Sequence, residues 1–245
     1  EIKCRIFQRN HKPKILICCP SNITQVEKNA IKEAAEKAGA KKVYLEEEPK
    51  VAAIGAGLDI SKPSGSMVID IGGGTTDIAI LSLGDIVIST SIKIAGNSFD
   101  NEIMKYIKNK YKLLIGERTA EEIKLKIGTV YSNKKKEKME VRGRNIVTGL
   151  PNTITISSEE IEEALKDNIK LIIHHTKSIL EQAPPELSAD IIDKGIVLTG
   201  GGSLLDGIDK VLSKELDIPV YIAENPLTCV AEGTGIMLDN LDLIE

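Results

Sequence analysis

The sequence has 245 residues, of which 42% are hydrophobic and 28% are charged, a balance typical of a globular protein with one large domain or two lobes. The formal net charge of −4, the 3% aromatic content and the absence of Trp exclude nucleic acid as the main partner, because the chain offers neither a basic field nor base-stacking side chains. No apolar run approaches the roughly 20 residues that span a bilayer, and no signal peptide is recognisable.

The cysteines indicate the redox compartment of the protein, and the first residue indicates whether the sequence begins at a natural N-terminus. Four cysteines occur without metal-ligand spacing to the three histidines. Cys18 and Cys19 lie in an apolar run, where buried free thiols are expected, and this usage is typical of a reducing cytoplasm. The chain begins with Glu1 instead of Met, which suggests that an N-terminal part of a longer protein precedes it.

The first part of the chain predicts a parallel strand–helix–strand unit. An apolar strand at residues 14–19 precedes a helix over about 24–38, where Thr24 and Glu27 have the spacing of a capping box. A second strand follows at 43–45. Two strands joined by a helix in this order form a crossover unit of a parallel sheet.

Three glutamates end the second strand, and Pro49 begins a predicted helix over 50–58. Carboxylates at this end of a parallel strand face the edge where open α/β sheets bind ligands. Glu48 is therefore a candidate for handling water or a metal, and the alternative is a solvated acidic turn. The polar stretch 61–65 then predicts a boundary between two lobes.

A strand at 67–71 runs into three glycines, Gly72 to Gly74. Without a Cβ, this turn is free to adopt positive φ and to bring its N–H groups close to an anion. Thr75 and Thr76 add hydroxyl donors, and Asp70 is placed to hold a hydrated cation. The pattern predicts a phosphate cradle, and the alternative is an ordinary glycine-rich hairpin.

Apolar strands at 78–82 and 86–92 follow the glycine turn. A dinucleotide fingerprint or a Walker loop requires a helix at this point. The predicted phosphate site therefore lies on a β-hairpin within a meander.

The middle of the chain predicts amphipathic helices at 99–112 and 119–130 and a long helix over 157–182 that begins with a capping box. Between them, a lysine-rich run at 134–138 precedes an exposed hairpin with a basic tip. A solvated charge run is the favoured interpretation of that tip, with an anionic lipid or partner as the alternative.

A second glycine turn, Gly200 to Gly202, follows a buried strand at 195–199 and leads into a predicted helix over 204–216 with Ser203 as its N-cap. A flat base or a phosphate can lie against such a turn. After a strand at 219–222, the last predicted helix spans 230–241. It contains Gly233 and Gly235, which suggests close packing or a ligand.

The two glycine signatures at 70–77 and 198–203 resemble those of the actin and heat-shock chaperone ATPase superfamily, and more closely those of the MreB family of bacterial actins. The resemblance covers essentially the whole chain. Further matching runs lie at 20–24, 47–58, 94–103, 120–128 and 225–227.

This resemblance implies an α/β actin-like ATPase fold, with ribonuclease-H-like mixed sheets flanked by helices and two lobes around a nucleotide cleft. The implied cofactors are ATP or ADP and Mg²⁺, the metal lying near Asp70 through water. Glu48 and Thr75 would position the attacking water. The other implied ligand-binding residues are Gly72, Gly73, Gly74 and Thr75 in the second phosphate loop, Asp100 near the γ-phosphate side, Glu121 and Lys124 at the ribose, and Gly200, Gly201, Gly202 and Ser203 at the adenine side.

The family's architecture assigns residues 1–60 and 233–245 to a partial first lobe (subdomain IA). It assigns 61–95 and 156–232 to subdomain IIA, and 96–155 to subdomain IIB. The family's first phosphate hairpin and the small subdomain of its first lobe are not found in the sequence, which leaves open whether this chain alone hydrolyses ATP.

The resemblance also implies a cytoskeletal ATPase in the cytoplasm that polymerises into filaments and determines cell shape. Its implied partners are further copies of itself, the inner face of the cytoplasmic membrane and cell-shape or envelope proteins. The alternative is a non-polymerising ATPase of the same superfamily, either chaperone-type or a small-molecule kinase. A filament protein with weakened hydrolysis is a third possibility, against which the presence of both Glu48 and Thr75 argues.

Overall fold

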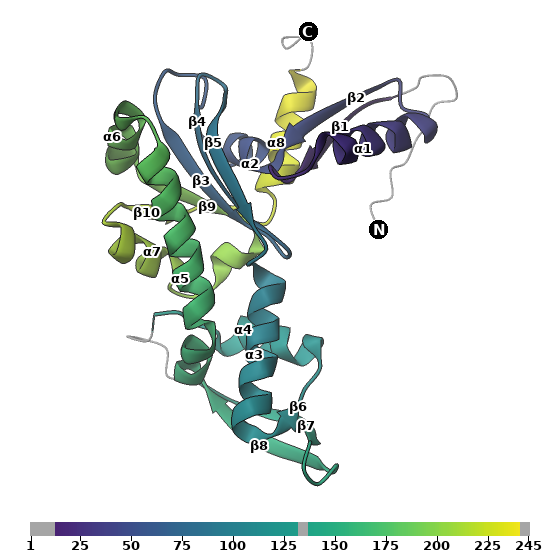
Figure 1. Cartoon of the computed structure of the whole chain (residues 1–245), viewed down its shortest axis with the longest axis vertical. Coiled ribbons are helices and arrows are strands. Elements are labelled where there is room, and N and C mark those ends of the chain that lie inside the picture. The colour runs from purple at the N-terminus through teal and green to yellow at the C-terminus, as the bar shows by residue number, and fades with distance from the viewer. Residues whose placement is uncertain (1–12, 132–136, 241–245) are drawn as a thin grey trace.

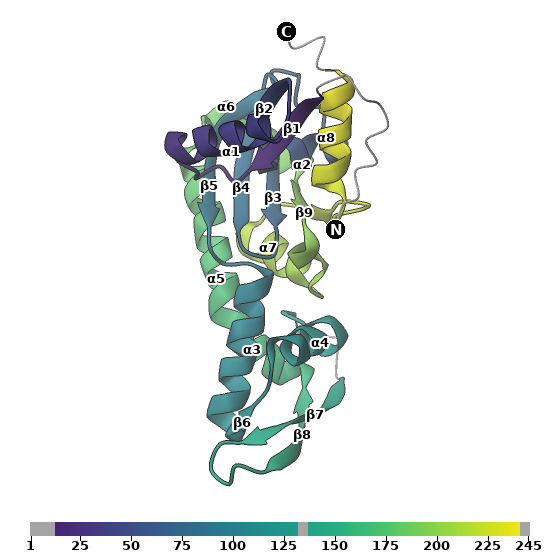
Figure 2. The ribbon, with the colours of Figure 1, turned by 90° about the vertical axis from the view of Figure 1, so that its right-hand side faces the viewer.

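The computed structural model describes residues 13–131 and 137–240, which form a mixed α/β architecture with three sheets in the described part of the chain. A small parallel sheet and a five-stranded sheet lie at one end, and a three-stranded sheet with two helices extends from the other end (Figure 1). The turned view shows β1, β2 and α1 in front of the five-stranded sheet, with α8 beside them (Figure 2).

The predicted strand–helix–strand unit is confirmed. Strands β1 (Lys14–Cys19) and β2 (Lys42–Glu47) pair in parallel and are joined by α1 (Gln25–Lys37). The capping box also forms, because the N–H of Thr24 donates to Glu27 Oε2 at 2.7 Å and the N–H of Glu27 donates to Thr24 Oγ1 at 3.3 Å. These bonds satisfy backbone donors that the first helical turn leaves open.

The next helix begins earlier than predicted. Helix α2 (Glu48–Gly55) follows β2 directly, with Pro49 in its first turn. Glu48 is therefore the first helical residue and not the end of the strand. Proline fits here because its fixed φ is helical and its missing N–H has no partner in the first turn.

The central sheet contains the predicted meander. Alternate residues of its middle strands face opposite sides: Ile69 and Ile78 pack toward α5, whereas Val68 and Ala79 pack toward α2. Strands β10, β9 and β3 are parallel, and β3, β4 and β5 are antiparallel. The strands in spatial order are β10 (Val220–Ile222), β9 (Ile196–Thr199), β3 (Ser66–Ile71), β4 (Thr76–Ser82) and β5 (Asp85–Ile92).

One long helix, α5 (Ser158–Gln182), packs against β4 and β5 of this sheet. Its predicted capping box is present, with the N–H of Ser157 donating to Glu160 Oε2 at 2.9 Å. A short helix, α6 (Pro185–Lys194), follows and was not predicted. Pro184 and Pro185 follow the end of α5, and Pro185 is the first residue of α6, a position that suits proline because its fixed φ is helical.

The extended end of the molecule is built by α3 (Gly96–Tyr111) and α4 (Glu117–Ile127), each starting two or three residues earlier than predicted. The predicted hairpin forms too, and its turn contains the exposed apolar residues Val147 and Leu150. The lysines at 134–136 lie outside the described residues. The strands of this block are β6 (Leu113–Leu114), β7 (Lys138–Asn145) and β8 (Pro151–Ser157).

The second glycine turn differs from the prediction. It forms a 3₁₀ turn, η1 (Gly201–Leu204), and the helix α7 (Ile208–Leu216) begins only after Gly207, which adopts φ +80° as its N-cap. Ser203 is therefore not a helix N-cap. Its hydroxyl donates to the carbonyl oxygen of Gly200 at 2.6 Å and closes the turn itself.

Helix α8 (Cys229–Asp239) crosses α2 at a point where both helices have glycine. A Cβ on Gly55 would overlap the carbonyl oxygen of Cys229, and a Cβ on Gly233 would overlap that of Val51. Gly235 has open space around its Cβ position. Close packing thus accounts for one of the two glycines that the sequence left unexplained.

We expect Gly233→Ala to lower the free energy of unfolding by about 1–3 kcal/mol, because the added methyl group forces two packed backbones apart. The matched variant Gly235→Ala has room for its methyl group and should raise that free energy by up to about 1 kcal/mol through better helix propensity. Urea denaturation of both variants measures the difference. Equal stabilities would show that the crossing is not tightly packed in solution.

Candidate functional site

Several predicted site residues line one cavity of about 330 Å³ between the two glycine turns and helices α3 and α4. The first turn reaches it from β3 and the second from β9, and the two helices supply Asp100, Glu121 and Lys124. The predicted residues in the lining are Gly72, Gly73, Asp100, Glu121, Lys124, Gly201 and Gly202.

The first glycine turn has an unexpected backbone. Gly72, Gly73 and Gly74 all lack the positive φ that the sequence suggested. The N-terminus of α3 fixes the turn, because the N–H of Gly96 donates to the carbonyl oxygen of Gly72 at 3.1 Å and the N–H of Asn97 donates to that of Gly73 at 2.8 Å. The turn is thus held by tertiary hydrogen bonds and does not need left-handed residues.

The space around these glycines indicates why side chains are absent. A Cβ on Gly73 would meet only Asn97 Oδ1 at 3.7 Å, and a Cβ on Gly74 would meet nothing within 4 Å. The protein itself therefore does not require glycine at either position. Bare backbone beside a cavity is what a closely approaching anion requires.

The two threonines after the glycines differ in their surroundings. Thr76 is fully buried, and its hydroxyl donates to the carbonyl oxygen of Ile94 at 2.6 Å, so it is not the free donor that the sequence suggested. Thr75 is only partly buried. Of the two hydroxyls, that of Thr75 is the one that remains suited to a ligand.

Asp100 and Lys124 form an ion pair across the cavity wall. The Lys124 ammonium donates to Asp100 Oδ2 at 2.8 Å and to the carbonyl oxygen of Gly96 at 3.1 Å. Asp100 Oδ1 is buried and has no partner among the described residues. The pair ties α4 to the N-terminus of α3, and Glu121 lies on the same helix as Lys124.

Packing explains most of the second glycine turn. Gly200 has φ +78°, and a Cβ there would overlap the carbonyl oxygen of Ile71. A Cβ on Gly202 would overlap the Ile71 side chain. Ser203 is fully buried and does not line the cavity, so the structure does not bring its hydroxyl to the predicted ligand. Gly201 and Gly202 offer only backbone to the cavity, and Leu204 at the end of the turn also lines it.

Three carboxylates gather beside the first glycine turn, outside the cavity lining. Asp70 is 6% exposed and accepts a hydrogen bond from Thr199 Oγ1 at 2.8 Å. Burial raises the pKa of Asp70, and the charge of Asp77 raises it further. The hydrogen bond from Thr199 lowers it by less than burial raises it. Burial, with the charges of Asp77 and Asp70, raises the pKa of Glu48 from 4.5 to about 7.

The sequence motif included Asp77, but sequence reasoning gave it no role. In the structure it is the cross-strand partner of Asp70 and is only 1% exposed. The signal that would have found it is register: a hairpin with a turn of this length pairs the residues that flank it.

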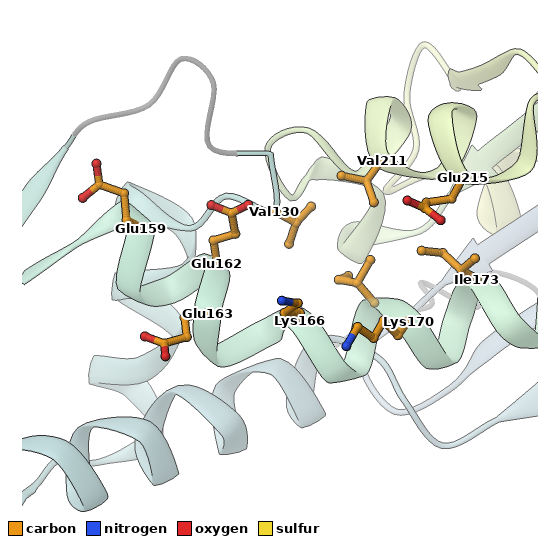
Figure 3. Close-up of a pocket in the computed structure, with 10 residues that line it drawn as sticks. Val130, Glu159, Glu162, Glu163, Lys166, Lys170, Ile173, Val211 and Glu215 are labelled. Carbon is orange, nitrogen blue, oxygen red and sulfur yellow. The ribbon is translucent and has the colours of Figure 1, made fainter.

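A larger cavity, of about 520 Å³, lies between α5 and α7 (Figure 3). Glutamates and lysines of α5 line it together with the apolar residues Val130, Ile173 and Val211, the last of which extends from α7. None of the predicted site residues lines it. Its size alone does not make it the functional site.

Solved structures define the class of fold. The crystal structure of MreB 5 of Spiroplasma citri bound to AMPPNP has a TM-score of 0.94 and 44% identity over 98% of this chain and 73% of that chain. MreB5 of Spiroplasma citri bound to ADP gives a TM-score of 0.91 and 46% identity over 94% and 70%. The MamK double helical filament, 21% identical with a TM-score of 0.80 over 95% and 70%, supports the fold alone. The chain therefore has the actin-like α/β fold, as predicted.

Sequence relatives define the family. The cell shape-determining protein Mbl of Bacillus cereus is 67% identical over 231 residues, which are 94% of this chain and 69% of the relative. The cell shape-determining protein MreB of Escherichia coli is 50% identical over 94% of this chain and 67% of the relative. The MreB/Mbl protein family matches residues 3–245. The chain belongs to the MreB/Mbl family, which confirms the resemblance of its motifs.

None of the helices in the described part of the chain combines the length and the apolar composition needed to cross a membrane.

If phosphates bind at the first glycine turn, Gly73→Ala should weaken ligand binding without destabilising the protein. The methyl group fits the free protein, so the thermal midpoint should stay within about 2 °C of the wild type. It occupies the space of the approaching anion, so affinity for ADP should fall about tenfold or more, which corresponds to about 1.4 kcal/mol. Isothermal titration calorimetry measures this, with Gly235→Ala as a control distant from the turn. Unchanged affinity would place the phosphates elsewhere.

Proposed function

We propose that this chain binds ATP or ADP with Mg²⁺ between its glycine turns, and that the intact protein hydrolyses ATP and polymerises into filaments that determine cell shape. The observation that carries the proposal is the bare backbone at Gly73 and Gly74, which the fold itself does not require, beside a cavity and buried carboxylates. The AMPPNP and ADP in the two Spiroplasma citri structures and the names of the relatives support it.

The residues fit a hydrated magnesium ion better than a directly ligated one. The described residues contain no group of three or more His, Cys, Asp or Glu side chains that would hold a metal by themselves. Asp70 and Asp77 are nonetheless both buried without a lysine or arginine ion pair in the described part of the chain. Mg²⁺ commonly keeps several waters and binds through one or two carboxylates and the phosphates of its substrate. Bound there, it would neutralise charge on the phosphates, with Asp70 holding one of its waters.

Different residues of the chain would bind the phosphates, the ribose and the adenine of the nucleotide. Gly72 to Thr75 would donate N–H groups and a hydroxyl to the phosphates. Glu121 and Lys124 would bind the ribose, with Asp100 holding Lys124 in place, and the backbone of the second glycine turn would lie against the adenine. Phosphoryl transfer depends mainly on such positioning and on charge stabilisation.

Glu48 is the proposed group that orients the attacking water. It begins α2 directly after β2, so its backbone is fixed by a strand on one side and a helix on the other. Thr75 approaches the same region from the glycine turn. A carboxylate that accepts a hydrogen bond from water directs the oxygen lone pair toward the phosphorus without needing to be a strong base.

Assembly and location are part of the same proposal. We infer longitudinal self-association into filaments in the cytoplasm, on the inner face of the cell membrane, together with cell-shape or envelope proteins. The proposed subdomains are IA (1–60 and 233–245), IIA (61–95 and 156–232) and IIB (96–155). The MamK double helical filament is a precedent for filament formation by this fold.

The first test measures pelleting and phosphate release of the intact protein with ATP and Mg²⁺. We expect nucleotide-dependent pelleting, and we expect Glu48→Ala to reduce phosphate release at least about a hundredfold because the attacking water loses its acceptor. Glu47→Ala is the matched control. Glu47 is the neighbouring glutamate at the end of β2, and its carboxylate lies 3.7 Å from the ammonium of Lys28 on α1. Phosphate release without pelleting across salt and magnesium conditions would contradict the filament proposal and favour a soluble ATPase of the superfamily.

The pKa of Glu48 makes the rate depend on pH. Because that pKa is raised to about 7, Glu48 is mostly protonated at pH 6 and becomes an acceptor as the pH rises through 7. We expect the rate of phosphate release to rise across this window in the wild type and to be low and flat in Glu48→Gln. A rate that is already maximal at pH 5.5 would show that another group orients the water.

A further inference from the structure

The larger cavity is a groove between two helices, α5 and α7 (Figure 3). Its lining residues on α5 run from Glu159 to Ile173 and recur every three or four residues. Residues with this spacing share one face of a helix, and the stretch covers about 21 Å of the helix, or about four turns. Val211 and Glu215 on α7 line the other side with the same spacing.

The groove has an apolar centre and a charged rim. The buried residues of its lining are all apolar, namely Val130, Ile169 and Ile173. Every charged residue that lines it is exposed or half-buried. Small-molecule sites usually place a few polar groups inside the pocket to orient the ligand, whereas protein–protein interfaces combine an apolar centre with a solvent-accessible polar rim. The groove has the anatomy of a protein–protein interface.

The rim carries uncompensated negative charge. Four glutamates and two lysines line the groove, but one of the lysines, Lys170, already pairs with Asp167 at 3.6 Å. Glu159, Glu162 and Glu215 make neither an ion pair nor a side-chain hydrogen bond with any described residue. Glu162 and Glu215 point into the groove from opposite helices (Figure 3). A partner that fits this rim is therefore basic.

We propose that this groove binds a basic amphipathic helix of a partner protein. An amphipathic helix lays its apolar face into an apolar groove, and lysines or arginines beside that face complement an acidic rim. The apolar side chains of the partner fill the space beside Val130 and Val211, and its cations pair with Glu162 and Glu215. The groove shares no lining residue with the cavity between the glycine turns, so the proposal does not depend on the proposed nucleotide site.

A synthetic peptide tests the proposal on the intact protein without nucleotide. The probe is a fluorescent peptide of about 15 residues, with leucines at helical positions i, i+3, i+4 and i+7 and lysines between them. Fluorescence anisotropy measures its affinity, and we expect saturable binding that weakens as salt is added. A peptide with glutamates in place of the lysines, and one with its leucines spread around the helix, should bind at least about tenfold more weakly.

Variants of the groove locate the binding. Glu162→Gln combined with Glu215→Gln keeps the side-chain shape and removes two charges, so the peptide should bind about tenfold more weakly or less. Val211→Lys puts a cation in the apolar centre, and we expect a loss of similar size. Glu181→Gln changes an exposed glutamate of α5 outside the groove and is the matched control. Thermal unfolding shows whether each variant is folded, and the glutamine pair decides the matter if Val211→Lys is not.

Several results would overturn the partner helix. Equal binding of the basic and acidic peptides, no peptide binding at all, or an unchanged affinity in the glutamine pair would each do so. Binding of the tripeptide lysine–leucine–lysine as tightly as the long peptide would identify a small-molecule pocket instead. Self-association that is lost in the glutamine pair, without peptide binding to the wild type, would identify a second copy of the chain as the occupant.

Discussion

The arrangement of the site depends on a helix crossing that has no side chains at its centre. Gly55 of α2 and Gly233 of α8 bring the two helix backbones together more closely than any other residue would allow. Alanines of α2 then pack on Val68 and Ala79 of the central sheet. Because α2 is short and clamped between α8 and the sheet, its first residue, Glu48, has little freedom to move away from the end of β3 and β4.

Because α2 is held in this way, the charge of Glu48 lies near two other carboxylates, where the fold has little to balance it. Asp70 and Asp77 lie side by side on neighbouring strands, and Glu48 faces them from another element. Like charges in a poorly solvated place oppose each other's ionisation. A cation bound beside them would relieve that repulsion, so the carboxylates that destabilise the empty protein would also favour the proposed cation–nucleotide complex.

Much of the fold was predictable because many helices and strands are specified by residues close together in the sequence. Thr24 with Glu27 and Ser157 with Glu160 marked two helix starts correctly, since a capping box needs only neighbouring residues. Ser203 was misread as a cap, because its hydroxyl is committed to Gly200 by a turn whose shape depends on packing against Ile71. Helix α6 was missed because a pair of prolines can end one helix and begin another.

The site was predictable as a motif and less so as chemistry. The glycine run at Gly72 to Gly74 predicted a ligand site, and Gly72 and Gly73 do line a cavity. The backbone conformation of the run depends on hydrogen bonds from α3, a partner distant in sequence. Asp77 was overlooked for a related reason. Whether a polar residue beside a turn faces solvent or a second carboxylate depends on register and on what covers that face, and neither is local information.

Helix α5 connects the two ends of the molecule. Its 25 residues span about 38 Å as one uninterrupted helix. It packs against β4 and β5 at one end and against α3 and β8 toward the other. In a rigid rod anchored in this way, a small rotation at the central sheet would give a larger displacement at the exposed apolar turn of β7 and β8. The far edge of the molecule is thus joined to the central sheet by one continuous element.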